Sequence, residues 1–142
     1  MTIEKWVVYA FISMFFAGFT SVIAKMGLSG VSAELGLTIR TLFVAAFIIM
    51  FAISVVPKEQ LAEVSTNNLF WLGLSGVTTA ISWVFYYKAL KEGDVATVAL
   101  IDKGSVVIAM LLAWLLLKEV ITLRMILGAA LIVAGLLVIS KK

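Results

Sequence analysis

The chain has 142 residues, of which 63% are hydrophobic and 13% charged, and its mean hydropathy is +1.18. This composition excludes a soluble globular protein, because too few polar side chains are present to cover a water-exposed surface. The net charge of +3 comes mostly from residues near the ends of apolar runs, where Lys and Arg favour lipid headgroups, so nucleic-acid binding is not expected. Histidine and cysteine are both absent, which excludes disulfides, haem ligation and the usual zinc sites, and no cofactor or metal is expected.

Five apolar runs follow one another along the chain. A bilayer core about 30 Å thick needs roughly 20 apolar residues per helix. We therefore expect membrane-spanning helices at residues 6–24, 35–56, 69–90, 95–117 and 120–140. The single proline, Pro57, falls just after the second run, where it ends a helix. Residues 1–142 are thus expected to form one all-α membrane domain, a bundle of five transmembrane helices, with no room for a soluble catalytic domain.

The basic residues between these runs scarcely distinguish one side of the membrane from the other, although cytoplasmic loops normally carry an excess of Lys and Arg. One side would carry Lys5, Lys58, Lys118 and Arg124, and the opposite side Lys25, Lys88, Lys91, Lys141 and Lys142, with Arg40 added if its side chain reaches that way. Two interpretations stay open. The chain inserts in one orientation, or it inserts in both and opposite copies pair about an axis in the membrane plane, as inverted repeats do within many transporters.

Several short segments in a fixed order resemble those of a known family. They are Phe16-Ala-Gly-Phe-Thr-Ser-Val-Ile-Ala-Lys25, Arg40 at the opening of the second run, Tyr87-Lys-Ala-Leu-Lys-Glu-Gly-Asp94, Leu115-Leu-Leu-Lys-Glu119 and Gly128-Ala-Ala-Leu-Ile-Val-Ala-Gly135. In this order they are similar to an EamA domain of the drug/metabolite transporter superfamily, over essentially the whole chain.

Typical members of this family hold two such domains, with inverted topology, in one chain of ten helices. The resemblance therefore implies that this chain, with one EamA-type repeat, works as a dimer. The partner would be an antiparallel second copy or an oppositely oriented homologous subunit, as in the related four-helix small multidrug resistance proteins. One position departs from the family pattern. Many EamA domains carry a proline near the middle of the fourth span, whereas this chain has Asp102-Lys-Gly-Ser105 there, which puts in doubt a mechanism that relies on a broken fourth helix.

The fourth run contains two adjacent charges, Asp102 and Lys103, seven and eight residues past Val95. At about 1.5 Å per residue they lie about 10 to 12 Å into the membrane. A charge near the bilayer centre costs roughly 2.5 to 3.5 kcal/mol, so such residues usually face a cavity, a partner or a substrate path. Adjacent helix positions do not face each other, and no local salt bridge is expected. Lys103 would then anchor a carboxylate or phosphate, with Asp102 as counter-charge or proton site. Alternatively, both form interhelical ion pairs that fix assembly, for example with Arg40 or with a second subunit.

A polar stripe with helical periodicity marks the third run. It consists of Ser75, Thr78, Thr79, Ser82 and Tyr86, with Trp83 and Tyr87 beside it. Thr79, Ser82, Trp83 and Tyr86 are predicted to line a substrate cavity. The alternative is close helix packing by the hydroxyl residues and a headgroup belt formed by the aromatic ones, which is the preferred interpretation for Tyr87.

Two further groups of residues have predicted roles. Lys25 and Arg40 match basic positions recurrent in the resembled family, and with Lys103 they could form a positive funnel for an anionic solute. The alternative is that they reach the headgroups from span ends, while Glu34 neutralises one of them. In the fifth run the glycines at 128 and 135 fall on nearly one helix face. By resemblance, Gly128, Leu131, Ile132 and Gly135 form the dimer contact; the alternative is packing within one subunit.

Together these features predict a secondary transporter of the prokaryotic plasma (inner) membrane. It would move a small organic metabolite, anionic or zwitterionic such as an amino acid, by alternating access in a dimer. Enzyme activity is not expected. Two alternatives stay open: a membrane assembly or accessory subunit whose buried charges specify partner helices, and a small dual-topology channel.

Overall fold

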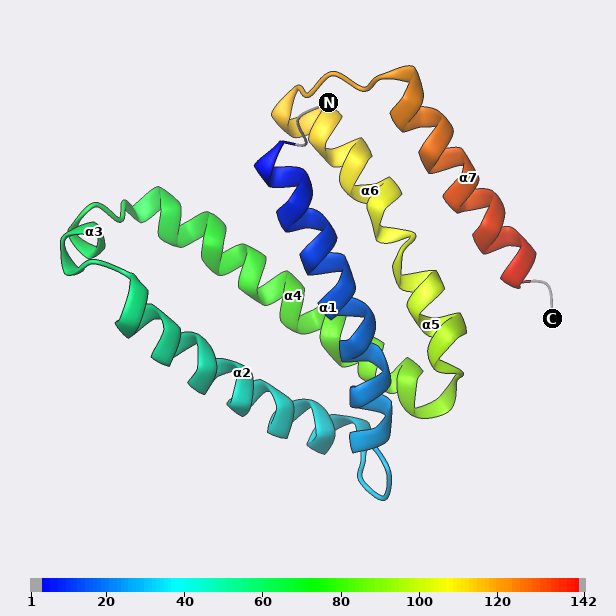
Figure 1. Cartoon of the computed structure of the whole chain (residues 1–142), viewed down its shortest axis with the longest axis horizontal. Helices are drawn as coiled ribbons and strands as arrows, with labels where there is room; N and C mark the ends of the chain where they lie inside the picture. The colour runs from blue at the N-terminus through cyan, green and yellow to red at the C-terminus, as the bar shows by residue number, and fades with distance from the viewer. Residues whose placement is uncertain (1–3, 141–142) are drawn as a thin grey trace. The chain divides into compact units, whose positions relative to one another are not determined.

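The computed structural model describes residues 4–140 of the chain, which form helices and loops and no β-strand (Figure 1). In chain order the elements are α1 (Lys5–Gly27), α2 (Ala33–Val55), α3 (Lys58–Ala62), α4 (Thr66–Glu92), α5 (Val95–Asp102), α6 (Ser105–Leu112), the π-helical turn η1 (Ala113–Leu117) and α7 (Leu123–Ser140). Within this part of the chain, four stretches are long and apolar enough to cross a membrane, namely α1, α2, α4 and the stretch Val95–Leu117. The prediction of an all-α membrane fold is confirmed. The fifth crossing stays a prediction, because α7 has only 18 residues.

Local sequence explains most helix boundaries. The Ser32 hydroxyl accepts a hydrogen bond from the Leu35 amide (3.2 Å) and caps the start of α2. At the other end, α2 stops at Val55, two residues before Pro57, as predicted. The start predicted for the last helix is wrong by three residues. Lys118 adopts a left-handed conformation (φ +58°) that ends η1, and the Thr122 hydroxyl accepts from the Met125 amide (3.3 Å), so α7 begins at Leu123.

The fourth span is broken in its middle, contrary to the expectation from its lack of proline. α5 ends at Asp102 and α6 begins at Ser105, with Lys103 and Gly104 forming a turn between them. The amides of Lys103 and Gly104 donate to carbonyls three residues earlier, those of Leu100 (3.1 Å) and Ile101 (2.9 Å). This tight pattern interrupts the α-helical ladder. The fourth span is therefore interrupted at Lys103 and Gly104 without a proline.

The chain divides into two compact units, which are best described separately. The unit Ile23–Glu92 contains the end of α1 together with α2, α3 and α4. Its helices α2 and α4 run antiparallel and pack against each other; they come closest where α2 begins and α4 ends, and diverge toward α3 (Figure 1). The small core of this unit lies at the close end, and consists of Leu28, Ala33, Tyr87 and Leu90, each at most 6% exposed.

The other unit comprises α1 as far as Val22 and everything from Gly93 onward. In it α7 packs against both α5 and α6. Gly104 makes this approach possible, because a Cβ there would lie 2.9 Å from Cδ1 of Leu136 on α7. In both units most large apolar side chains are exposed, for example Phe43 (75%) and Ile53 (80%), which suits helices that face lipid rather than water.

Candidate functional site

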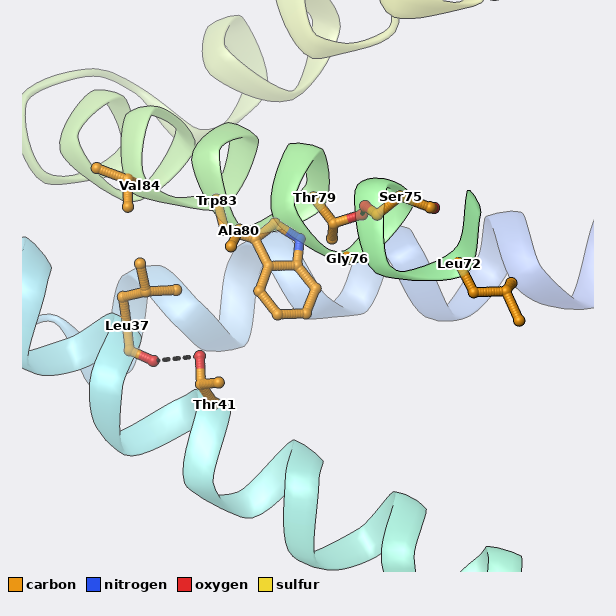
Figure 2. Close-up of a pocket in the computed structure, with 9 residues that line it drawn as sticks. All are labelled: Leu37, Thr41, Leu72, Ser75, Gly76, Thr79, Ala80, Trp83 and Val84. Atoms are coloured by element: carbon orange, nitrogen blue, oxygen red, sulfur yellow. Dashed lines mark hydrogen bonds between the residues drawn. The ribbon is translucent and has the colours of Figure 1, made fainter. Parts of the chain in front are cut away.

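A pocket of about 520 Å³ lies between α2 and α4. Figure 2 shows the Trp83 indole reaching from α4 into the space between the two helices. The lining residues on α4 recur at intervals of three and four, so they share one face of the helix, while those on α2 are one turn apart. The full lining is Leu37 and Thr41 from α2, with Leu72, Ser75, Gly76, Thr79, Ala80, Trp83 and Val84 from α4.

The walls of this pocket are mostly apolar. The hydroxyls of Thr41 and Thr79 donate to carbonyls of their own helices, those of Leu37 (2.8 Å) and Ser75 (2.8 Å). Their oxygens stay available as acceptors, and Trp83 offers an aromatic face. No acidic or basic side chain is among the lining residues. The pocket therefore suits the apolar part of a small organic molecule.

The predicted polar stripe overlaps this pocket only in part. Thr79 and Trp83 line it, as does Ser75, whereas Ser82 and Tyr86 do not. The position of α2 decides which face of α4 lines the pocket, and that face includes small and apolar residues as well as polar ones. Thr41 was not predicted from the sequence as a lining residue. Its hydroxyl, next to Arg40 in an apolar segment, was the signal that could have indicated it. A role in substrate binding stays a prediction for all four predicted residues.

Arg40 lies beside the pocket, in contact with one of its lining residues. Its guanidinium carbon is 4.2 Å from the ring centroid of Trp83 and 5.8 Å from that of Tyr87, an arrangement favourable for cation–π attraction. Its Nη1 atom is buried and has no hydrogen-bond partner among the described residues. The headgroup-reaching interpretation of Arg40 stays a prediction. The headgroup belt is wrong for Tyr87, which is 4% exposed, because α2 covers it.

Lys25 and Lys91 cap each other's helix ends. The Lys25 ammonium donates to the carbonyls of Leu90 and Lys91 (3.3 Å to the latter), in the last turn of α4. The Lys91 ammonium donates to the Leu28 carbonyl (2.9 Å), just after α1. Each cation thus sits at the negative end of the other's helix. Lys25, predicted to bind substrate, is engaged by these carbonyls, and its direct contact with a solute stays a prediction.

An ion pair in the same unit joins Lys88 and Glu34 across 3.5 Å, with both side chains more than half exposed. The predicted neutralisation by Glu34 thus involves Lys88 and neither Lys25 nor Arg40. Lys103 lies in the other unit, and its convergence with Arg40 stays a prediction.

Asp102 and Lys103 form an ion pair with each other, which corrects the expectation that neighbouring residues would not meet. Lys103 Nζ lies 3.7 Å from Asp102 Oδ2, with the two side chains 55% and 39% exposed. The expectation assumed a continuous helix, in which successive side chains diverge. The turn at Lys103 and Gly104 removes that geometry. Whether either charge meets a substrate stays a prediction.

The glycine face of α7 has open space beside it in its own unit. A Cβ built at Gly128 or at Gly135 would meet no atom within 4 Å, and Leu131 between them is 74% exposed. Both the dimer contact and the alternative of packing within one subunit stay predictions. The described residues also hold no group of three or more Asp or Glu side chains arranged to bind a metal ion.

Comparison with known proteins gives matches that extend along nearly the whole chain. Residues 4–141 match the model of the EamA-like transporter family. A protein of a Sinorhizobium species, named "Uncharacterized transporter in cobO 3'region", is 34% identical over 137 residues, which make up 96% of this chain and 97% of that protein. No solved structure gives a significant match.

Proposed function

Since the chain belongs to the EamA-like transporter family, as a single-domain protein of the drug/metabolite transporter type, we propose that it is a secondary transporter. Its solute is a small anionic or zwitterionic organic metabolite, such as an amino acid, moved by alternating access across a prokaryotic inner membrane. The observation that carries this proposal is the pocket of about 520 Å³ between two apolar helices, each long enough to cross a membrane, with the Arg40 guanidinium on the Trp83 ring beside it. A concave, mostly apolar site with one nearby charge is typical of small-molecule binding.

The transporting unit in this proposal is an inverted homodimer, in which a second copy supplies the half that two-domain members carry in the same chain. The unpacked glycine face of α7 supports it, because Gly128 and Gly135 leave room for the close approach of another helix. An oppositely oriented homologous subunit could pack against the same face of α7. Transport would be driven by the solute's own gradient or by protons.

Transport is tested with the purified protein in liposomes, by measuring the uptake of radiolabelled amino acids and organic acids, one at a time. We expect protein-dependent uptake of at least one solute. Lys103→Met combined with Asp102→Asn removes the ion pair without leaving a lone charge in the membrane. If this double variant loses uptake but stays dimeric, these residues serve transport. If the wild type takes up no solute and the double variant only dissociates, the chain is an accessory subunit instead.

The dimer is tested with two bulky substitutions at glycines that both have open space around them. Gly135→Leu on α7 should dissociate the dimer in detergent, whereas Gly73→Leu on α4, where a Cβ also meets nothing within 4 Å, should not. Equal effects would remove α7 as the contact. Reporters active on one side of the membrane only, fused after Lys142, decide the orientation. Comparable signals from both sides indicate an inverted homodimer, and a signal from one side alone rules it out.

A further inference from the structure

Arg40 holds a positive charge that the described part of the chain does not balance. It lies seven residues past Ala33, roughly 10 Å along α2 at about 1.5 Å per residue. The carboxylate nearest in sequence, Glu34, is paired with Lys88, and Nη1 of Arg40 is buried without a hydrogen-bond partner. A buried guanidinium donor without an acceptor is unfavourable in a membrane. An anionic group that reached the guanidinium would supply the acceptor that the described residues do not.

The Trp83 side chain connects the Arg40 guanidinium to the pocket. Trp83 is in contact with Arg40 and also lines the pocket (Figure 2). A molecule lying along the indole would therefore have its apolar part in the pocket and one end within reach of Arg40. A guanidinium presents parallel N–H donors that match the two oxygens of a carboxylate.

For a positively charged group on the ligand, the pocket has no counterpart to Arg40. No carboxylate is among its lining residues, and the protons of the Thr41 and Thr79 hydroxyls are already donated to their own helices. An α-ammonium that entered the pocket would lose its hydration and would find only hydroxyl oxygens as acceptors, with no carboxylate to balance its charge. This asymmetry discriminates between an organic acid and the amino acid of the same shape.

We propose that the site of Arg40, Trp83 and the pocket beside them takes a hydrophobic monocarboxylate, with the carboxylate on Arg40 and the apolar body along Trp83, and that it discriminates against the corresponding zwitterion. This inference rests on the transport function proposed above and narrows its substrate class. Arg40 is the residue that selects the acid group, and Trp83 holds the body.

The test measures binding to the purified protein in nanodiscs of phosphatidylcholine. The probes are 3-phenylpropanoate, phenylalanine, which adds the α-ammonium, and 3-phenylpropanamide, which lacks the charge. We expect 3-phenylpropanoate to bind about tenfold or more tightly than either of the others, since one charge-assisted contact is worth about that much. Arg40→Met should weaken its binding by a similar factor. Lys58→Met is the matched control, because it removes an exposed cation of the same unit that is far along the chain from Arg40, and it should leave binding unchanged.

A second variant separates an effect on binding from a failure of Arg40→Met to fold. Arg40→Lys keeps the charge but not the planar pair of donors, and we expect it to fold and to bind 3-phenylpropanoate more weakly than the wild type. Binding unaffected by Arg40→Lys and Arg40→Met, or equal binding of phenylalanine, overturns the proposal. So does loss of 3-phenylpropanoate binding when phosphatidylglycerol is added to the nanodiscs, because the anion at Arg40 is then a lipid headgroup.

Binding and flux separate the two proposals. If none of the three probes binds while the same preparation moves some other solute across liposomes, the monocarboxylate inference fails and the transport function stands. If 3-phenylpropanoate binds as expected but no solute crosses, the site assignment stands and the transport function fails.

Discussion

Gly36, in the first turn of α2, lies where the loop after α1 packs most closely on the helix. A Cβ at this position would overlap Cδ2 of Leu28 and would lie 3.6 Å from Cγ of the same residue and 3.9 Å from Cε1 of Tyr87. Leu28 is only 2% exposed and Tyr87 4% exposed, so neither can turn into solvent to make room. Gly36→Ala should therefore destabilise the protein by overpacking.

The magnitude follows from two opposing effects. Alanine favours a helix over glycine by at most about 1 kcal/mol, whereas extra methyl groups in a packed site cost about 1 to 3 kcal/mol. Against the full helix gain, the net expectation for Gly36→Ala is a loss of up to about 2 kcal/mol in the free energy of unfolding. Gly73→Ala is the matched control, because a Cβ there meets nothing within 4 Å. That variant should be unchanged or more stable by about 0.5 to 1 kcal/mol.

Unfolding in mixed detergent and SDS micelles, followed by far-ultraviolet circular dichroism, measures both variants. The combined Gly36→Ala and Leu28→Ala variant should lose less stability than the sum of the two single losses, because Leu28→Ala removes the atoms that the new methyl group would overlap. A Gly36→Ala protein as stable as the Gly73→Ala protein would refute the packing described for this end of α2.

Two further substitutions test contacts in each unit. Lys25→Met should lower the free energy of unfolding by about 1 to 2 kcal/mol, because it removes charge-assisted hydrogen bonds to the Leu90 and Lys91 carbonyls at the end of α4. Hydrogen exchange should rise in the last turn of α4, and unchanged exchange there would contradict this cap. Gly104→Ala should cost about 1 to 2 kcal/mol, since its Cβ would lie 2.9 Å from Leu136 Cδ1 and 3.0 Å from a backbone carbonyl. Leu136→Ala should relieve this only partly, and a Gly104→Ala variant of unchanged stability in the same unfolding assay would show that the break accommodates a side chain.

Hydropathy and local signals in the sequence predicted the membrane class and the approximate positions of the helices. Apolar length decides whether a segment enters a bilayer, and that property needs no knowledge of its neighbours. Pro57 was identified correctly as following the end of α2, because proline acts through its own backbone geometry. The order of short segments also predicted the family, which the match of residues 4–141 confirms. Of the residues predicted to line a cavity, Thr79 and Trp83 do so, since helical periodicity places residues on a common face.

The remaining features depend on which helices lie side by side, and local patterns do not carry that information. Arg40 stacks on Trp83, and Tyr87 is buried, because α2 packs on α4. Nothing within either segment specifies that pairing. Asp102 and Lys103 meet because the backbone turns at Gly104, where Leu136 of α7 approaches. The sequence by itself thus determined which segments are helical and apolar, which is a property of each segment alone. Only the tertiary structure decided which charges are paired, capped or left without an acceptor, because those states depend on contacts between residues far apart in the chain.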